Sequence, residues 1–340
     1  KEYLGQEVVP NSGCGSWLME GQSTNLVTQS ELFSDAYWSK LSSNVTSGFT
    51  SPSGQNNAYR FLTTSGGSSY LFTSGISVID STIYTASFYV KSNGNSLDIL
   101  KIYSSYGNSL SITATSNWEK IEYTFTSSSV SLDLGLKGES PNTDVLIYGF
   151  QLEQNSYATS YIPTQGATST RLQDIANNSG NASLINSEEG VLYAEISALA
   201  NHNLQRWVGV SDGTTNNSLI IGFLNSNTSY RIACEIKSGN SSQAFMTYNF
   251  GAVEPTFAKI AISYAENNFS LWVNGVEVST DTSGATPIGL SELNFDRGDG
   301  VADFYGKNKA LAVFKTALTD ASLRCLTYPP AVATTFDLDF

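Results

Sequence analysis

Hydrophobic and polar residues alternate through most of the first half of the chain. Ala86, Phe88 and Val90 share one face of an expected strand, and the same alternation follows after Asn117, with apolar Ile121, Tyr123 and Phe125 opposed by Lys120, Glu122 and Thr124. A period of two residues is typical of strands with one buried face. No stretch before residue 155 has the spacing of an amphipathic helix. About eight short strands joined by turns predict a β-sandwich or jelly roll.

The stretch 146–153 ends this pattern and predicts the closing strand of the first domain. Its alternation places Leu146, Tyr148, Phe150 and Leu152 on one face, with Ile147, Gly149, Gln151 and Glu153 on the other. Residues 155–170 are rich in Ser, Thr and Gly and contain Pro163, which is typical of a connector. We therefore expect an N-terminal extended segment at 1–23 that adds to or docks on the first domain, a domain at 24–154, and a packed connector at 155–170.

A second block with a different rhythm occupies residues 171–330. It begins with a strand that carries Leu192, Ala194 and Ile196 on one face. Asn274-Gly275 between Val273 and Val276 predicts a two-residue hairpin, because a type I′ turn needs φ > 0 at both central residues. Thr319 is the expected N-cap of a short helix that reaches about Leu326. The tail, 331–340, is expected to form one more strand or a free end.

Composition agrees with two domains and excludes some partners. The 340 residues are 40% hydrophobic, 12% aromatic and only 14% charged, which is enough apolar material for two cores. A net charge of −13 repels phosphate backbones, so nucleic-acid binding is disfavoured. No apolar run approaches the ~18 residues of a membrane span, so membrane insertion is not expected. The start at Lys1 suggests cleavage or a longer polypeptide.

The second block resembles the concanavalin A-like, laminin-G-type sandwich. The resemblance rests on four motifs in order: Glu189-Gly190-Val191-Leu192-Tyr193-Ala194-Glu195, Leu271-Trp272-Val273-Asn274-Gly275, Phe304-Tyr305-Gly306-Lys307 with Ala310-Leu311-Ala312-Val313-Phe314, and Thr316-Ala317-Leu318-Thr319-Asp320.

The first block is similar to jelly-roll carbohydrate-binding modules, through Ser23-Thr24-Asn25-Leu26, Trp38, Phe88-Tyr89-Val90, Trp118 and the junction from Gln151-Leu152-Glu153 to Arg171. The tandem order resembles the distal parts of bacteriophage fibre and appendage proteins. Together the resemblances imply two tandem antiparallel β-sandwiches in an all-β protein, the second concanavalin A-like.

Sugar binding requires an aromatic ring that stacks on a pyranose face, with polar partners for the hydroxyls. Candidate rings on outward phases or in loops of the first block are Tyr89, Tyr103, Tyr106 and Trp118, and those of the second block are Trp207 and Trp272. Ordinary sandwich packing is the alternative for each of them. Trp272 either faces solvent or covers the second sheet. Trp38 is expected to be a core or edge plug rather than a ligand platform.

The acidic loop 294–303 is the best metal candidate, with Asp296, Asp299 and Asp303 as oxygen ligands for Ca²⁺. Its spacing does not match an EF-hand, and the alternative is a turn in which Asp and Gly supply left-handed positions. No cofactor is required by the sequence.

The sequence lacks the catalytic motifs of common hydrolases. Glycosidases of the concanavalin family carry Glu-x-Asp-x-x-Glu on one strand, and the chain lacks this motif. A single histidine, His202, leaves little room for a histidine-based triad or metal site, and no Gly-x-Ser-x-Gly elbow is present. We therefore expect no enzymatic activity.

The sequence favours a non-enzymatic virion appendage, a tail or head fibre module that binds host cell-surface polysaccharide. Its expected partners are that polysaccharide, other virion structural proteins and further copies of itself in a homo-oligomer. The expected location is the virion surface, with secretion as the alternative. A purely structural fibre or capsid-decoration protein and a fragment of a secreted polysaccharide-active enzyme are the other two hypotheses.

Overall fold

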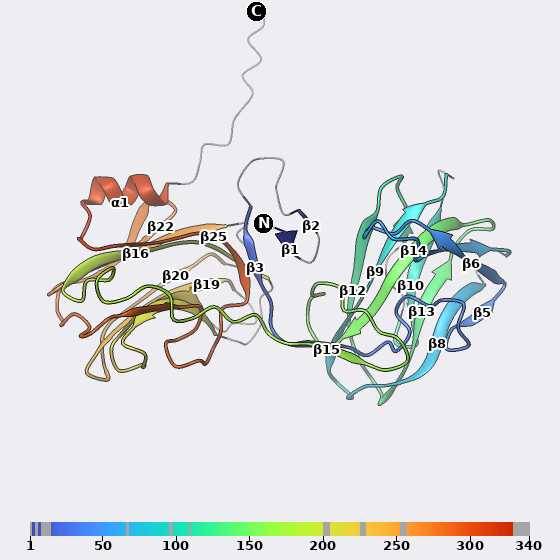
Figure 1. Cartoon of the computed structure of the whole chain (residues 1–340), viewed down its shortest axis with the longest axis horizontal. Helices are drawn as coiled ribbons and strands as arrows, with labels where there is room; N and C mark the ends of the chain where they lie inside the picture. The colour runs from blue at the N-terminus through green and yellow to red at the C-terminus, as the bar shows by residue number, and fades with distance from the viewer. Residues whose placement is uncertain are drawn as a thin grey trace, which may run out of the picture. The chain divides into compact units, whose positions relative to one another are not determined.

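The computed structural model describes residues 2–3, 6–7, 15–65, 68–94, 98–107, 109, 111–199, 205–224, 229–251 and 257–328. The chain divides into two compact units, one of Gln22–Gln173 and one that joins Lys1–Gly21 to Asp174–Phe340. Each unit contains an antiparallel β-sandwich (Figure 1), so the predicted all-β fold class of two tandem sandwiches is confirmed. The expected tail at 331–340 lies outside the described residues.

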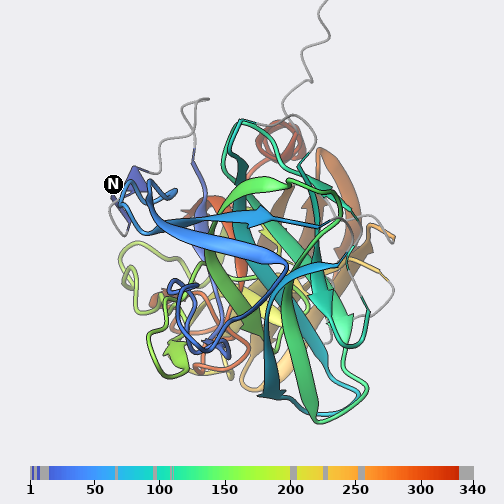
Figure 2. The same ribbon diagram turned by 90° about the vertical axis from the view of Figure 1, so that its right-hand side faces the viewer.

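The first sandwich consists of two five-stranded sheets (Figure 2). Sheet 1 has the order β11-β10-β13-β8-β5, which are Ile112–Thr113, Ile99–Ser104, Ser131–Gly138, Ser69–Ser77 and Ser39–Leu41. Sheet 2 has the order β12-β9-β14-β7-β6, which are Glu119–Thr126, Ile83–Ser92, Asp144–Glu153, Ala58–Thr63 and Ser43–Phe49.

Alternate residues of both sheets fill one core. Leu71, Leu134 and Ile102 of sheet 1 pack with Phe88 and Val90 of sheet 2, all fully buried. Trp38 is a core plug, as predicted: it is 1% exposed, and its indole N–H donates to the Gln29 carbonyl at 2.8 Å.

Strand β14 departs from the predicted alternation. Its pairing with β9 shifts register between Tyr148 and Gln151, where Gly149 adopts a φ of 65°. This bulge moves Ile147 into the core together with Phe150 and Leu152, while Tyr148 lies outside that core. A β-bulge changes the face on which later residues point, so the prediction of one face for Leu146, Tyr148, Phe150 and Leu152 was wrong.

The second sandwich has sheets of six and five strands. Sheet 3 has the order β23-β22-β21-β16-β25-β3, which are Val276–Asp281, Asn268–Val273, Ala258–Ala265, Glu189–Ala198, Gly306–Phe314 and Trp17–Met19. Sheet 4 has the order β20-β19-β18-β17-β24, which are Ser241–Asn249, Arg231–Ser238, Ser218–Phe223, Arg206–Ser211 and Glu292–Asn294. Ile196, Ile262 and Leu271 of sheet 3 share a core with Val208 and Ile221 of sheet 4.

Residues 17–20 of the expected N-terminal segment join the second sandwich and not the first. Trp17–Met19 pairs with β25 through Met19 and Gly306, and Glu20 N–H donates to the Asp174 carboxylate at 2.8 Å. The expected docking of this segment on the first domain is therefore corrected. The edge of β25 offers unpaired backbone groups that a passing extended segment can satisfy. Upstream, β1 (Glu2–Tyr3) pairs with β2 (Gln6–Glu7).

The local signals of the second block are confirmed. Val273 pairs with Val276 across Asn274 and Gly275, whose φ values are 48° and 84°. Helix α1 (Asp320–Thr327) begins after Thr319, whose side chain accepts a hydrogen bond from the Ser322 N–H. This eight-residue helix is the only one among the described residues, and it is too short and too polar to span a membrane.

Candidate functional site

The outer face of sheet 1 carries two rows of side chains that run across its strands. Tyr103 on β10 is opposite Gly135 on β13, and Gly135 is opposite Phe72 on β8. In the neighbouring row, Lys137 on β13 is opposite both Lys101 and Tyr70. The intervening residues point into the core, and these point away from it because side chains alternate along a strand.

Three rings of this face form a contiguous cluster, Tyr70, Phe72 and Tyr103, which we call the aromatic patch. The ring centroids of Tyr70 and Tyr103 are 5.3 Å apart at 74°, and those of Phe72 and Tyr103 are 5.8 Å apart at 81°. Such edge-to-face contacts fix the rings against one another. All three are half-buried, so each ring is held by packing yet keeps part of its surface exposed.

Gly135 lets the patch form. A Cβ at this position would lie 2.1 Å from the Leu71 carbonyl oxygen and 2.4 Å from the Phe72 Cα. Without a side chain, strands β13 and β8 approach closely and the rings of Phe72 and Tyr103 meet across the gap. Glycine in the interior of a strand often marks such a close backbone approach.

Charged side chains lie at both ends of the aromatic patch. Glu139 accepts from both lysines, with its Oε2 2.9 Å from Lys101 Nζ and its Oε1 3.1 Å from Lys137 Nζ. The hydrogen bond from Lys101 is the main cause that holds the pKa of Glu139 below its ordinary value. At the other end, Asp133 Oδ1 accepts from the Gly75 N–H at 3.1 Å. Burial, and then the nearby Asp133 charge, raises the pKa of Tyr103.

The structure places only one of the first block's four candidate rings in this patch, Tyr103. The Tyr106 hydroxyl donates to the Ser131 carbonyl at 2.5 Å, and its ring packs against Phe125. Tyr89 lies on sheet 2, where it packs against Tyr148. Trp118 directly precedes β12 of the same sheet and is half-buried. The four candidate rings predicted from the sequence thus belong to different parts of the sandwich, and they do not form one site.

The two tryptophans of the second block are buried. Trp207 is 3% exposed and packs with Ile220 and Ala233, and its backbone N–H donates to the Ala302 carbonyl of the covering loop. Trp272 is 6% exposed and packs with Tyr193 and with Leu323 of α1. A ring enclosed in this way presents no face to a sugar, so both are structural residues and not stacking platforms.

The acidic loop at 294–303 is a hydrogen-bonded turn. Asp296 accepts from the Gly298 N–H, Asp299 pairs with Arg297 at 2.7 Å, and Asp303 accepts from the Tyr305 hydroxyl at 3.0 Å. Gly298 has a φ of 96°, as the turn interpretation requires. Within the described ranges no group of three or more His, Cys, Asp and Glu side chains could hold a metal ion. The three aspartates are thus not brought together as a Ca²⁺ site.

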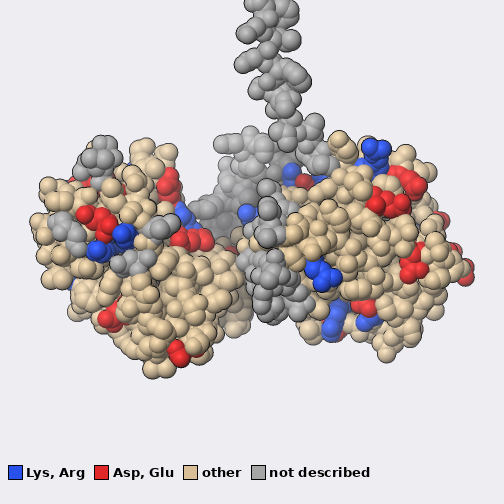
Figure 3. Space-filling model, turned by 180° about the vertical axis from the view of Figure 1, so that it is seen from behind, with Lys and Arg blue, Asp and Glu red and all other residues tan. Residues whose placement is uncertain are grey.

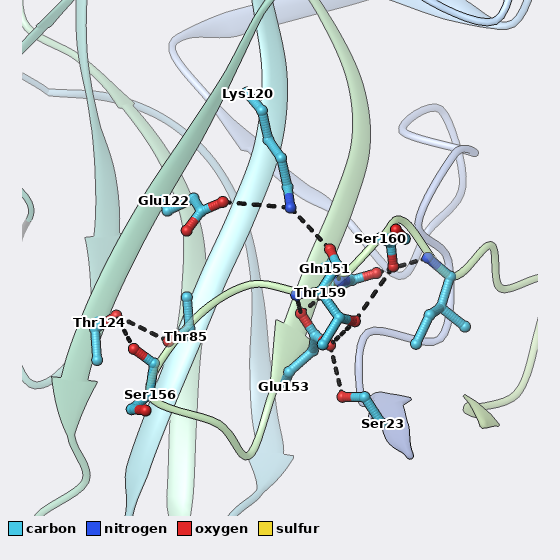
Figure 4. A network of polar contacts seen from close by, with 11 residues as sticks. Ser23, Thr85, Lys120, Glu122, Thr124, Gln151, Glu153, Ser156, Thr159 and Ser160 are labelled. Carbon is cyan, nitrogen blue, oxygen red and sulfur yellow. Dashed lines mark hydrogen bonds and ion pairs between the residues drawn. The ribbon is translucent and has the colours of Figure 1, made fainter. Parts of the chain in front are cut away.

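The Gln151-Leu152-Glu153 junction forms a buried polar network (Figure 4). Glu153 is fully buried and accepts from the Ser23 hydroxyl at 2.6 Å, the Thr159 N–H at 3.0 Å and the Gln151 amide. Gln151 also accepts from the Ile162 N–H at 2.7 Å. These bonds tie the connector to β14 and to β4 (Ser23–Asn25), which pairs with β15 (Ser169–Arg171). The junction is therefore a structural clasp, because its polar groups are satisfied internally.

Sequence reasoning missed Tyr70, Phe72 and the charged residues beside them. The alternation of Tyr70, Leu71, Phe72 and Thr73 held the signal, since it sets two aromatic residues on one face of a strand. Their proximity to Tyr103 depends on strand order, which joins β8 and β10 through β13. Local patterns do not reveal this order.

The chain matches no protein-family model and no curated protein. Among solved structures it is similar to the CBM40 module of the Ruminococcus gnavus IT-sialidase, with 16% identity over 46% of this chain and 96% of that one and a TM-score of 0.36. A SAP-like pentraxin from Limulus polyphemus shares 11% identity over 44% and 72% of the two chains, with a TM-score of 0.33. The tandem CBM22 domains of Paenibacillus barcinonensis Xyn10C share 11% over 88% and 98%, with a TM-score of 0.30. Because these TM-scores are low, the similarities identify no functional site in this chain. The candidate site is therefore assigned from its own geometry.

Proposed function

We propose that the chain is a non-enzymatic carbohydrate-binding protein that holds a glycan against the aromatic patch. The observation that carries the proposal is the set of three fixed, partly exposed rings, Tyr70, Phe72 and Tyr103, bordered by charged groups. A pyranose has an apolar face of C–H groups that packs on an aromatic ring, and hydroxyls that need donors and acceptors. Lys101 supplies donors and Asp133 supplies acceptor oxygens.

The surroundings of the patch support binding without hydrolysis. Glycosidases place two carboxylates on either side of the scissile bond, one of them protonated as an acid. Here Glu139 is shared between two lysines, whose charges favour its ionised form, and Asp133 accepts a backbone N–H. The hydrogen bond from Lys101 lowers the pKa of Glu139, which is opposite to the raised pKa of a catalytic acid.

Charged residues do not gather into one large patch on the face of the molecule that Figure 3 draws. Figure 3 shows acidic and basic residues in small mixed groups, separated by broad uncharged areas. Recognition on such a surface relies on local shape, stacking, hydrogen bonds and individual charges, which suits a polyhydroxylated ligand.

The finer proposal is that this binding serves a bacteriophage appendage that attaches to host surface polysaccharide, as a homo-oligomer together with other virion proteins. Its support is the sequence resemblance, in which a jelly roll precedes a concanavalin A-like sandwich. Mass spectrometry of purified phage particles from the source culture tests it. Peptides of this chain in the particles are expected, and their recovery only from the cell-free medium would favour a secreted protein instead.

Glycan binding is tested by an array of host-type polysaccharides with Phe72→Ala and Tyr103→Ala variants. Truncating a central aromatic residue of a binding site weakens affinity by about tenfold or more. Phe245→Ala is the matched control, because Phe245 on β20 is an exposed ring (54%) in the other sandwich. Both patch variants should lose retention while the control keeps it. Equal retention by all four proteins would overturn the assignment of the site.

Two outcomes separate the alternatives. A wild-type protein that binds no glycan but assembles with itself would support a purely structural fibre or decoration protein. Release of reducing ends from a polysaccharide, abolished by a single Glu substitution, would support the enzyme fragment.

A further inference from the structure

We infer that the glycan bound at the aromatic patch is acidic, and that its anionic group lies against Lys101 and Lys137. This inference rests on the proposed function and specifies the class of ligand. It is carried by the charge arrangement at one end of the patch.

Two lysines directly opposite each other on neighbouring strands are an unfavourable pair. Lys101 and Lys137 occupy paired positions on β10 and β13, and like charges in this geometry repel. One carboxylate, Glu139, is shared between them, with one oxygen to each ammonium group. One positive charge at this end is therefore uncompensated by Glu139, in a chain whose net charge is −13.

The lysines are placed where a ligand on the patch would reach them. Lys137 is the cross-strand neighbour of Tyr70, and Lys101 is two residues from Tyr103 on the same strand. Their side chains are 19% and 25% exposed, so the stems pack on the sheet while the remaining surface meets solvent. A saccharide stacked on the rings brings a ring substituent over the ammonium groups.

Asp133 makes the two ends of the aromatic patch opposite in charge. It precedes Gly135 on β13, whereas Lys137 follows it, so the patch has a cationic end and an acidic end. An anionic substituent is attracted to the lysines and repelled from Asp133, and Asp133 can accept from sugar hydroxyls. The ligand chemistry that fits is a saccharide with a carboxylate or a sulfate on one edge and free hydroxyls on the other.

Glu139→Gln is the decisive variant, because it is expected to increase the affinity for the acidic glycan. The carboxylate of Glu139 competes with the ligand for both lysines, so its removal should strengthen binding of the acidic glycan about two- to fivefold. Lys101→Met with Lys137→Met keeps the aliphatic stems and should weaken it about tenfold. Binding of neutral glycans should be unchanged in Glu139→Gln. Weaker acidic-glycan binding by Glu139→Gln would overturn the inference.

The probes are polygalacturonate, alginate and hyaluronan, each beside its carboxyl-reduced form, and dextran beside sulfated dextran. Affinity electrophoresis of the full chain should show retention by an acidic polymer and loss of retention on reduction. Retention by sulfated dextran alone, sensitive to the lysine variants, would identify sulfate as the anionic group. Equal retention by a polymer and its carboxyl-reduced form, or by neutral polymers only, would overturn this inference and leave the proposed function standing. No retention by any polymer would overturn both.

Discussion

Gly135 is the residue on which the aromatic patch depends. Its missing side chain allows β8 and β13 to approach, and the nearest atoms to an added Cβ are backbone atoms of Leu71 and Phe72 that cannot rotate away. The patch is thus built on a backbone feature and not only on the presence of three rings.

Gly135→Ala is expected to destabilise the first sandwich by about 1–3 kcal/mol, the usual cost of overpacking, and to weaken glycan retention. Urea unfolding measures the first effect. Gly21→Ala is the comparison, because a Cβ there meets only the edge of the Tyr305 ring at 3.2 Å, which can shift. Unchanged stability of Gly135→Ala would show that the strands are not held as closely as described.

The two described cysteines differ in environment and should differ in reactivity. Burial raises the pKa of the Cys234 thiol well above its ordinary value, and Cys325 is exposed on α1. Thiolate is the reactive form. In a Cys14→Ser background, a maleimide at neutral pH should label Cys325 in the folded protein and label Cys234 only after unfolding. Equal rates for both would contradict the packing of Cys234.

The strand β14 and the connector behave as one structural element. Glu153 is buried without an ion pair to any described residue and relies on hydrogen bonds from Ser23, Thr159 and Gln151. Removal of a buried acceptor leaves its donors unsatisfied, which costs more than the net value of the bonds.

Glu153→Ala is therefore expected to lower the free energy of unfolding of the first sandwich by about 2–4 kcal/mol. Glu122→Ala on the same sheet is the matched control, since the Glu122 side chain is 44% exposed and its carboxylate pairs with Lys120 at 3.3 Å. That change should cost less than about 1 kcal/mol. Chemical denaturation of both variants measures the difference, and similar losses would show that the clasp contributes little.

Local pattern predicts elements well where one face is buried and no irregularity intervenes. The strand with Phe88, the Asn274-Gly275 hairpin and the helix after Thr319 follow directly from periodicity and turn chemistry. The predicted face of Leu146 and Tyr148 was wrong, because the bulge at Gly149 is not visible in the sequence as a break in alternation.

Burial of single aromatic residues is harder to predict because it depends on other elements. Trp272 has the phase of an outward residue on β22, and it is buried only because α1 lies over it. Trp207 is covered through the loop at Ala302 in the same way. The aromatic patch escaped prediction for the related reason that non-sequential strands assemble it.

Each sandwich has its own core, and the proposed site lies within one of them. The core that contains Trp38 and Phe88 draws all its residues from Gln22–Gln173, as do the patch and its charged neighbours. The fragment 22–173 should therefore unfold in one cooperative transition and retain the glycans bound by the full chain. Differential scanning calorimetry and affinity electrophoresis of the fragment check both points, and a fragment that folds without binding would relocate the site.

A crystal structure with an oligosaccharide that the protein retains would test the aromatic patch most directly. We expect a sugar ring in van der Waals contact with Phe72 and Tyr103, with its acidic group directed to Lys101 and Lys137. An oligosaccharide bound to any other surface, with the aromatic patch left free, would contradict this expectation.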